Sequence, residues 1–407
     1  MIKFFNGVYR AGARPSRFLS TLIVSGIAYG LYRGVQDNYL VEVIKITPFE
    51  RGIVEFFREI PGLLVMLLLA AMYRFSESKI FKIGVAIMLA GMTCILFSPS
   101  IKALVVICMV IFSFGEHIVM PVRSTISMDL AEESRRGASL GITSTINNLG
   151  NISGYLIVTL LFFIFARLGF SRTDTVQFRT VFAISAALMV AAVLISLAIK
   201  ETELKSSRRR FYIAKKFNKY YMLEIFYGAR KQIFFTFGPL VLIAHYNADT
   251  SIISFLLAIC AGAGMLFSPL AGKLIDRIGF KKVMVLDTLL LIFVCFFYGF
   301  SHRLFSLHTA FIVVCVNYVL DSILSLGSMA SNVYAQSVSS SQEELTATLS
   351  TGISLNHLIS IFIALSGGWI WKVTGIEVLF SLSALLGLLN SIYAATIKTG
   401  EAAVKTN

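Results

Sequence analysis

Long apolar stretches recur along the whole chain and are separated by short polar breaks. A helix needs about 20 apolar residues to cross the hydrocarbon core of a bilayer. The apolar runs are continuous rather than alternating, which argues against membrane strands. The pattern therefore predicts twelve membrane-spanning helices, at residues 17–43, 50–72, 80–98, 103–127, 138–166, 179–199, 220–245, 250–271, 282–300, 305–333, 346–371 and 376–397.

The composition agrees with an integral membrane protein. Of the 407 residues, 57% are hydrophobic and only 14% are charged, whereas a soluble domain carries about 25% charged residues. No polar remainder is left to form a soluble domain beside a single anchor. The five cysteines lie in apolar spans without paired spacing and are expected to be buried small side chains. We therefore expect no disulfide, no metal site and no cofactor.

The net charge of +14 is distributed unevenly between the two sides of the predicted membrane domain. With the N-terminus placed in the cytoplasm and residues at the ends of spans counted with the adjoining loop, 23 of the 36 Lys and Arg residues lie on the cytoplasmic side, 8 on the opposite side and 5 inside spans. This bias predicts that both termini are cytoplasmic, in a plasma (inner) membrane. The basic segment 200–219 is typical of a linker that touches anionic headgroups, so no nucleic-acid partner is expected.

The same basic linker divides the chain into two similar halves. Six spans precede it in residues 1–199 and six follow it in residues 220–407. The sequence "STINNLGNISG" in the fifth span resembles "SLNHLISIFIA" in the eleventh, and Glu116 of the fourth span corresponds by position to Asp321 of the tenth. Such repeats are typical of transporter folds. The predicted fold class is an all-α polytopic membrane protein with two pseudo-symmetric six-helix bundles.

One loop carries a family resemblance. The segment "GKLIDRIGFKK" resembles the loop signature of the major facilitator superfamily, with Phe280 where a basic residue is usual. Glycines permit a tight turn and a close helix approach, and an aspartate can pair with a basic group or a helix N-terminus. The resemblance implies a gating role for this loop, at Gly272, Asp276, Arg277 and Gly279. The first-half copy, with Tyr73, Glu77 and Ser78 at the equivalent places, is degenerate. The stretch 367–389 is similar to the family's last span junction.

The resemblance also implies that the first, fourth, seventh and tenth spans line a central cavity. These spans contain the charges Arg33, Asp37, Glu116, His117, Arg123, Glu224, Arg230, Lys231 and Asp321. A charge near the middle of a bilayer is costly and usually faces a cavity or a partner. The predicted substrate-binding residues are Arg33, Gln36, Asp37, Asn147, Asn151, Lys231 and Asn356, and the predicted proton-coupling residues are Asp37, Glu116 and Asp321.

Several of these residues have alternative interpretations. Arg33 and Asp37, four residues apart, also have the spacing of a purely structural ion pair. Glu55, Arg58 and Glu59 are predicted to form a gate near the outer mouth, with a substrate or proton role as the alternative. Arg123 is predicted to act as a gate or as a loop partner of Asp129. His117 is expected to be a packed histidine.

The charges favour a secondary transporter of a small anionic or zwitterionic organic solute, working by alternating access and coupled to protons. We expect a monomer in the lipid bilayer that binds a small-molecule substrate. The alternative is a drug-efflux antiporter, because Gly141, Gly150 and Gly154 reproduce the glycine spacing of an efflux signature, although Tyr155 replaces its proline. No Gly-x-Ser-x-Gly or His-Glu-x-x-His motif is present, so an enzyme is not expected.

Overall fold

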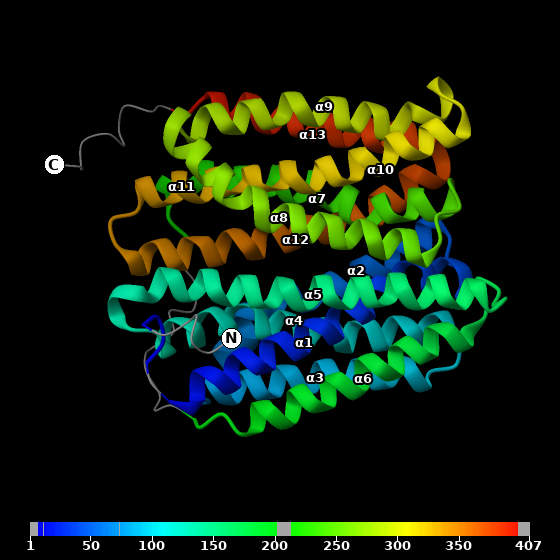
Figure 1. Ribbon diagram of the computed structural model, residues 1–407. Coiled ribbons are helices and arrows are strands. Elements are labelled where there is room, and N and C mark those ends of the chain that lie inside the picture. Colours follow the sequence, from blue (N-terminus) through cyan, green and yellow to red (C-terminus); the bar gives the residue numbers. More distant parts are fainter. Residues whose placement is uncertain (1–6, 11, 73, 202–212, 398–407) are drawn as a thin grey trace. The chain divides into compact units, whose positions relative to one another are not determined.

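The computed structural model describes residues 7–10, 12–72, 74–201 and 213–397. These residues are almost entirely helical, and their only β-structure is an isolated antiparallel bridge between Tyr9 and Ala131 (Figure 1). Among the described residues, ten helical stretches are long and apolar enough to cross a membrane. The two further expected spans, at 50–72 and 220–245, do not meet that test, and both contain several charged residues. The all-α membrane fold is confirmed.

The first half contains six long helices. They are α1 (Ala13–Asn38), which continues as a π-helical turn at Tyr39–Val43, α2 (Pro48–Ala71), α3 (Glu77–Phe97), α4 (Lys102–Leu130), α5 (Arg136–Arg167) and α6 (Thr175–Leu197). Each begins one to four residues before a predicted span, and α2, α3 and α6 end one or two residues before the predicted end. The start of α3 has a visible cause, because the Ser76 side chain accepts a hydrogen bond from the backbone of Lys79 at 3.3 Å.

The second half repeats this arrangement with one interruption. Its helices are α7 (Asn218–Ala244), α8 (Thr250–Ile278), α9 (Phe280–Leu304), α10 (Leu307–Leu324), α11 (Met329–Val338), α12 (Gln342–Thr374) and α13 (Ile376–Ala395). The predicted tenth span is divided into α10 and α11 by a 3-10 turn at Ser325–Ser328. The hydroxyl of Ser325 donates to Ser322 O at 2.7 Å and that of Ser328 to Ser325 O at 2.9 Å. Such serine-to-backbone bonds compete with regular helical pairing.

The chain forms two compact units whose borders fall inside two helices. The N-terminal unit contains most of the first half together with Asp249–Gly262, the first turns of α8. The C-terminal unit contains most of the second half together with Ile46–Met66, which includes the first turns of α2. Within the N-terminal unit α1 packs against α5 and α6, and α3 packs against α4. Within the C-terminal unit α7 packs against α12 and α13, and α9 packs against α10 and α13.

Glycines bring α1 and α5 into backbone contact. A Cβ atom built on Gly30 would lie 2.2 Å from Asn151 O, and one on Gly154 would lie 2.7 Å from the Cα of Gly30. A Cβ atom on Gly150 would similarly lie 2.9 Å from the Cα of Gly26. Small residues at this spacing let membrane helices approach closely. Two glycines of the efflux-like spacing therefore have a packing role, whereas Gly141 faces open space.

The loop between α8 and α9 agrees only in part with the expectation from the sequence. Gly279 has a φ of +85°, a conformation that favours glycine, so the tight turn is confirmed. A Cβ atom on Gly272 would meet nothing within 4 Å among the described residues, so the close helix approach predicted there is wrong. Asp276 and Arg277 are exposed, and Asp276 has no hydrogen bond or ion pair within the part of the chain described.

Candidate transport site

Polar side chains of α1 and α4 meet inside the N-terminal unit. Arg33, Gln36 and Asp37 are 6%, 1% and 3% exposed, as expected of charges enclosed in a membrane protein. One turn before Arg33, the hydroxyl of Tyr29 donates to Glu116 Oε1 at 2.9 Å. The structure therefore places Asp37 and Glu116, two of the predicted proton-coupling residues, on helices that share a hydrogen bond.

Two other residues of α4 were given minor roles from the sequence. The ring nitrogen Nδ1 of His117 lies 2.8 Å from Ser113 O and 3.1 Å from Ser113 Oγ, a contact with its own helix that fits a packed histidine. Arg123 makes no ion pair with Asp129 among the described residues, so that predicted partnership is wrong. The physical reason is their spacing, because six residues place two side chains on different faces of a helix.

The asparagines of α5 lie against α1. In the amide orientation that satisfies both of its polar atoms, Asn151 donates to Gly26 O at 3.1 Å and to Asn147 O at 3.2 Å. Asn147 and Asn151 are both half-buried. The side chain of Asn151 thus already serves the α1–α5 contact, and a role in substrate binding would require it to exchange these partners.

A second charged group lies within the C-terminal unit, between α7, α9 and α10. Arg230 is 2% exposed, and its Nη1 lies 3.8 Å from Oδ1 of Asp321. Its Cζ lies 5.5 Å from the centre of the Tyr227 ring. Asp287 of α9 is close enough for its charge to act on Arg230. Sequence reasoning assigned no role to Asp287, although it is the one carboxylate within the ninth apolar run.

The start of α7 carries another buried carboxylate. Glu224 is 7% exposed and accepts a hydrogen bond from the hydroxyl of Ser331 on α11 at 2.7 Å. The amide of Asn356 on α12 lies beside the same carboxylate and beside Gly228. The predicted substrate residue Asn356 therefore has a partner inside its own unit. Lys231, by contrast, is exposed.

Comparison with known proteins identifies the family of this two-part helical fold. The model of the Major Facilitator Superfamily matches residues 18–221 and 220–406, nearly the whole chain. The chain belongs to the Major Facilitator Superfamily. It is therefore a membrane transporter built from many spanning helices, and the resemblance of the α8–α9 loop is confirmed at the level of the family. No curated protein sequence matches the chain.

Solved structures of this superfamily share the fold at low sequence identity. The nucleoside transporter NupG superposes with a TM-score of 0.74 at 15% identity, covering 94% of this chain and 99% of NupG. A D-xylose-proton symporter gives 0.71 at 14% identity, covering 95% and 99%. A POT family transporter in complex with 5-aminolevulinic acid gives 0.70 at 12% identity, covering 93% and 94%. At these identities the likeness shows the fold alone.

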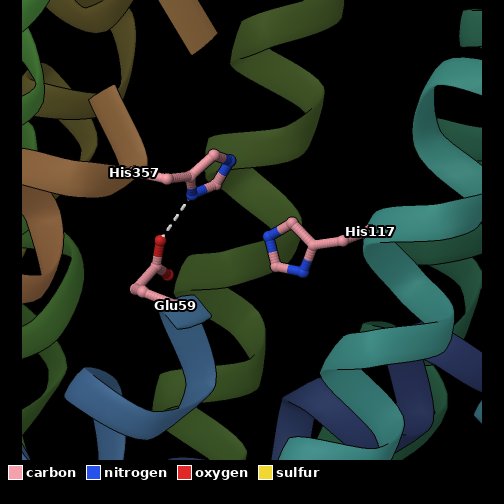
Figure 2. Close-up of side chains that lie close together, drawn as sticks. All are labelled: Glu59, His117 and His357. Atoms are coloured by element: carbon pink, nitrogen blue, oxygen red, sulfur yellow. Dashed lines mark hydrogen bonds and ion pairs between the residues drawn. The ribbon is translucent and has the colours of Figure 1, made fainter. Parts of the chain in front are cut away.

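Three of the predicted gate residues, Glu55, Arg58 and Glu59, form a buried network in the C-terminal unit. Arg51 pairs with Glu55, and Arg58 Nε donates to Glu55 Oε2 at 2.8 Å. Arg58 Nη2 lies 3.3 Å from Glu59 Oε1, and Nδ1 of His357 on α12 lies 2.7 Å from Glu59 Oε2. Figure 2 shows the Glu59 carboxylate and the His357 ring facing one another. The network ties the first turns of α2 to α12.

Sequence reasoning missed two members of this network. Arg51 was identifiable, because it stands four residues before Glu55 and so shares its helix face. His357 gave no comparable pattern, since it is far from Glu59 in sequence and lies on another helix.

Proposed function

We propose that this Major Facilitator Superfamily protein is a secondary active transporter of a small polar organic solute, anionic or zwitterionic, coupled to protons and working by alternating access. The observation that carries the proposal is the placement of ionisable side chains. They occur deep in α1, α4, α7 and α10, whereas residues 83–97 of α3 and 180–197 of α6 carry none. Enclosed charges of both signs are typical of a polar transport pathway.

The roles follow from charge and hydrogen-bonding capacity. Arg33 and Lys231 suit a carboxylate or phosphate on the solute, because guanidinium and ammonium groups form strong charge-assisted hydrogen bonds. Gln36, Asn147 and Asn356 offer amide groups for its polar atoms. Asp37, Glu116 and Asp321 are proposed to bind and release the proton, since burial favours the neutral form of a carboxyl group.

The superfamily relatives support a polar solute in general terms. They include a nucleoside transporter, a D-xylose-proton symporter and a transporter in complex with 5-aminolevulinic acid. We propose that the protein resides in the inner membrane with both termini in the cytoplasm, on the basis of the Lys and Arg distribution. We further propose that Glu55, Arg58, Glu59 and Arg123, with the α8–α9 loop, control access to the site.

Uptake into liposomes that contain the purified protein tests this function. The vesicles are loaded at alkaline pH and offered nucleosides, pentoses, amino acids and organic acids in turn from an acidic medium. Accumulation of one class above protein-free vesicles, abolished by a proton ionophore, is the expected result. Accumulation that is the same with and without the ionophore would contradict the proposed proton coupling. Expulsion of solute against an inverted gradient would favour the efflux antiporter, and movement of none of these classes would contradict the proposed substrate class.

A further inference from the structure

Three helices of the C-terminal unit bring two carboxylates and one guanidinium together in the protein interior. The residues are Arg230 of α7, Asp287 of α9 and Asp321 of α10. We propose that these three form a site that binds a single proton, and that the proton exchanges with Glu224 through a small cavity. The inference rests on the proposed proton-coupled transport and deepens it, because Asp287 becomes a proton-binding residue beside Asp321.

The hydrogen bonding of the cluster is incomplete. Both Nη1 and Nη2 of Arg230 are buried without a hydrogen-bond partner among the described residues, and so is Oδ1 of Asp287. The 3.8 Å between Arg230 and Asp321 is an ion pair but is too long for a hydrogen bond. Buried donors and acceptors without partners are costly. The guanidinium is therefore stabilised when it forms hydrogen bonds to one carboxylate. The second carboxylate then has no cationic partner and can bind a proton.

The charge count leads to the same result. With all three groups ionised the cluster carries one net negative charge inside the protein, and one bound proton makes it neutral. A buried uncompensated charge is strongly unfavourable, and two carboxylates that share a site disfavour double ionisation. A sodium ion would supply the same charge, but it would lie beside the guanidinium and be repelled by it. A proton becomes part of the carboxyl group and needs no extra ligands.

The other titratable groups around the cluster do not compete for the proton. Tyr227 of α7 and Cys295 of α9 are the further titratable groups that act on Arg230, and phenol and thiol groups are neutral near pH 7. The 3-10 turn presents Gly327, whose Cβ position lies 3.0 Å from Cγ of Asp287. From α13 the nearby polar group is the amide of Asn390, which does not titrate.

A small cavity reaches from Asp287 to Ser331. Its lining includes Tyr227, Asp287, Ser328 and Ser331. The volume that the centre of a water molecule could occupy in it is about 10 Å³. That volume suits about one water molecule, and the lining offers the polar partners that a buried water requires. The Ser331 hydroxyl in turn donates to Glu224. Asp287, Ser331 and Glu224 therefore mark out a route for proton exchange within the unit.

Infrared spectroscopy of the full-length protein in lipid films tests the site without any solute. During a pH titration the wild type should lose one carboxylic acid C=O band that shifts in deuterium oxide. That band should be absent from Asp287→Asn and from Asp321→Asn, because one remaining carboxylate pairs with Arg230 and has no need of a proton. It should return in Asp287→Glu, and Glu132→Gln, at an exposed carboxylate outside the cluster, should retain it. Persistence of the band in Asp287→Asn would overturn the site.

The exchange route has its own readout. After a rapid rise in pH the band should decay more slowly in Glu224→Gln than in the wild type, while its amplitude is unchanged. An unchanged decay rate would show that the proton does not exchange through Glu224.

A transported solute separates this inference from the proposed function. Asp287→Asn should still exchange solute across the vesicle membrane but should lose accumulation driven by a pH gradient. A wild type that has the band but moves no solute would defeat the transport proposal and leave the proton site in place. Gradient-driven accumulation by Asp287→Asn equal to that of the wild type would defeat the inference and leave the function in place.

Discussion

Neighbouring basic residues of α7 have opposite surroundings. Arg230 is 2% exposed and pairs with Asp321, whereas the next residue, Lys231, is exposed. Successive residues point about 100° apart on a helix with 3.6 residues per turn, so one faces its own unit and the other does not. Lys231 is therefore the basic group of α7 that remains available to a solute.

Replacing Arg33 or Lys231 with Gln should weaken solute affinity. Each change removes a hydrogen bond to a charged group, which contributes about 1.5–3 kcal/mol. Titration calorimetry with the solute found by the uptake panel measures the loss. Lys273→Gln, at an exposed lysine of α8, is the matched control and should bind as the wild type does. Wild-type affinity in both Arg33→Gln and Lys231→Gln would contradict the anion-binding role.

His245 should titrate below the ordinary range of histidine. It follows the last residue of α7, its ring centre lies 5.0 Å from that of His302, and His302 Nε2 lies 3.3 Å from Glu377 Oε1. The His245 ring is exposed, but its neighbours desolvate it in part and so lower its pKa; positive charge on His302 lowers it further, and Glu377 opposes the shift. The fold thus favours neutral His245, and this stabilising contribution is lost as the pH falls below the ordinary value toward the lowered pKa.

NMR titration of isotope-labelled histidine checks this. In His302→Gln the pKa of His245 should rise toward its usual value. A value for His245 that does not move in that variant would show that the two rings do not interact electrostatically.

The sequence predicts which side chains are charged within spans, but not which of them meet. Asp287 had no predicted role, because the rotation of α9 about its axis cannot be read from the apolar run. Arg123 was paired with Asp129 by proximity in the chain, whereas helix geometry separates their side chains. The Tyr29–Glu116 hydrogen bond joins residues of two helices, and their relative positions depend on packing.

Among the elements, the α1–α5 pair is sensitive to added volume, because glycines bring the two backbones into contact. Gly154→Ala should lower the stability by about 1–3 kcal/mol, because its methyl group would lie 2.4 Å from Ile27 O. Gly141→Ala, on the same helix but facing open space, should be neutral or stabilising by about 0.5–1 kcal/mol through helix propensity. Thermal unfolding in detergent distinguishes the two. Equal melting temperatures would mean that the helices separate without cost.

The extent of the elements was largely predictable, because apolar length and bilayer thickness constrain each other. The break at Ser325–Ser328 was not, since serine and glycine also occur within continuous membrane helices. Its position next to Asp287 depends on the tertiary packing of the turn against α9. The packing role of Gly150 and Gly154 could not be separated in the sequence from the efflux-like spacing, because small residues at such spacing serve both.

For the molecule as a whole, Asp276→Asn should change the balance between inward-open and outward-open states and leave solute binding intact. Asp276 is exposed and contacts no other charge within the described residues, so its loss removes no binding group. Accessibility of engineered cysteines at the two membrane faces measures the balance. Glu132→Gln, at an exposed acidic residue of the α4–α5 loop, is the control. Loss of all solute affinity in a folded Asp276→Asn protein would contradict the gating role.

The orientation in the membrane can be tested at Ser206, within the basic linker and outside the described residues. In a background without native cysteines, Ser206→Cys should react with a membrane-impermeant thiol reagent only from the cytoplasmic side. A cysteine in the α5–α6 loop at Ser171 should show the opposite behaviour. Labelling of Ser206→Cys from outside intact cells would reverse the proposed topology.

The membership of the first turns of α8 in the N-terminal unit bears on how the chain is made. Ser254 donates to Gly34 O at 2.8 Å, and Ser251 donates to Thr159 O at 3.0 Å. When α6 has just emerged from the ribosome, neither serine has been synthesised. The first bundle is therefore in the membrane at that stage without these two hydrogen bonds to its carbonyl groups. Translation past residue 262 supplies them. A pause introduced between the two halves should therefore prolong the time during which the first bundle is open to quality-control proteases.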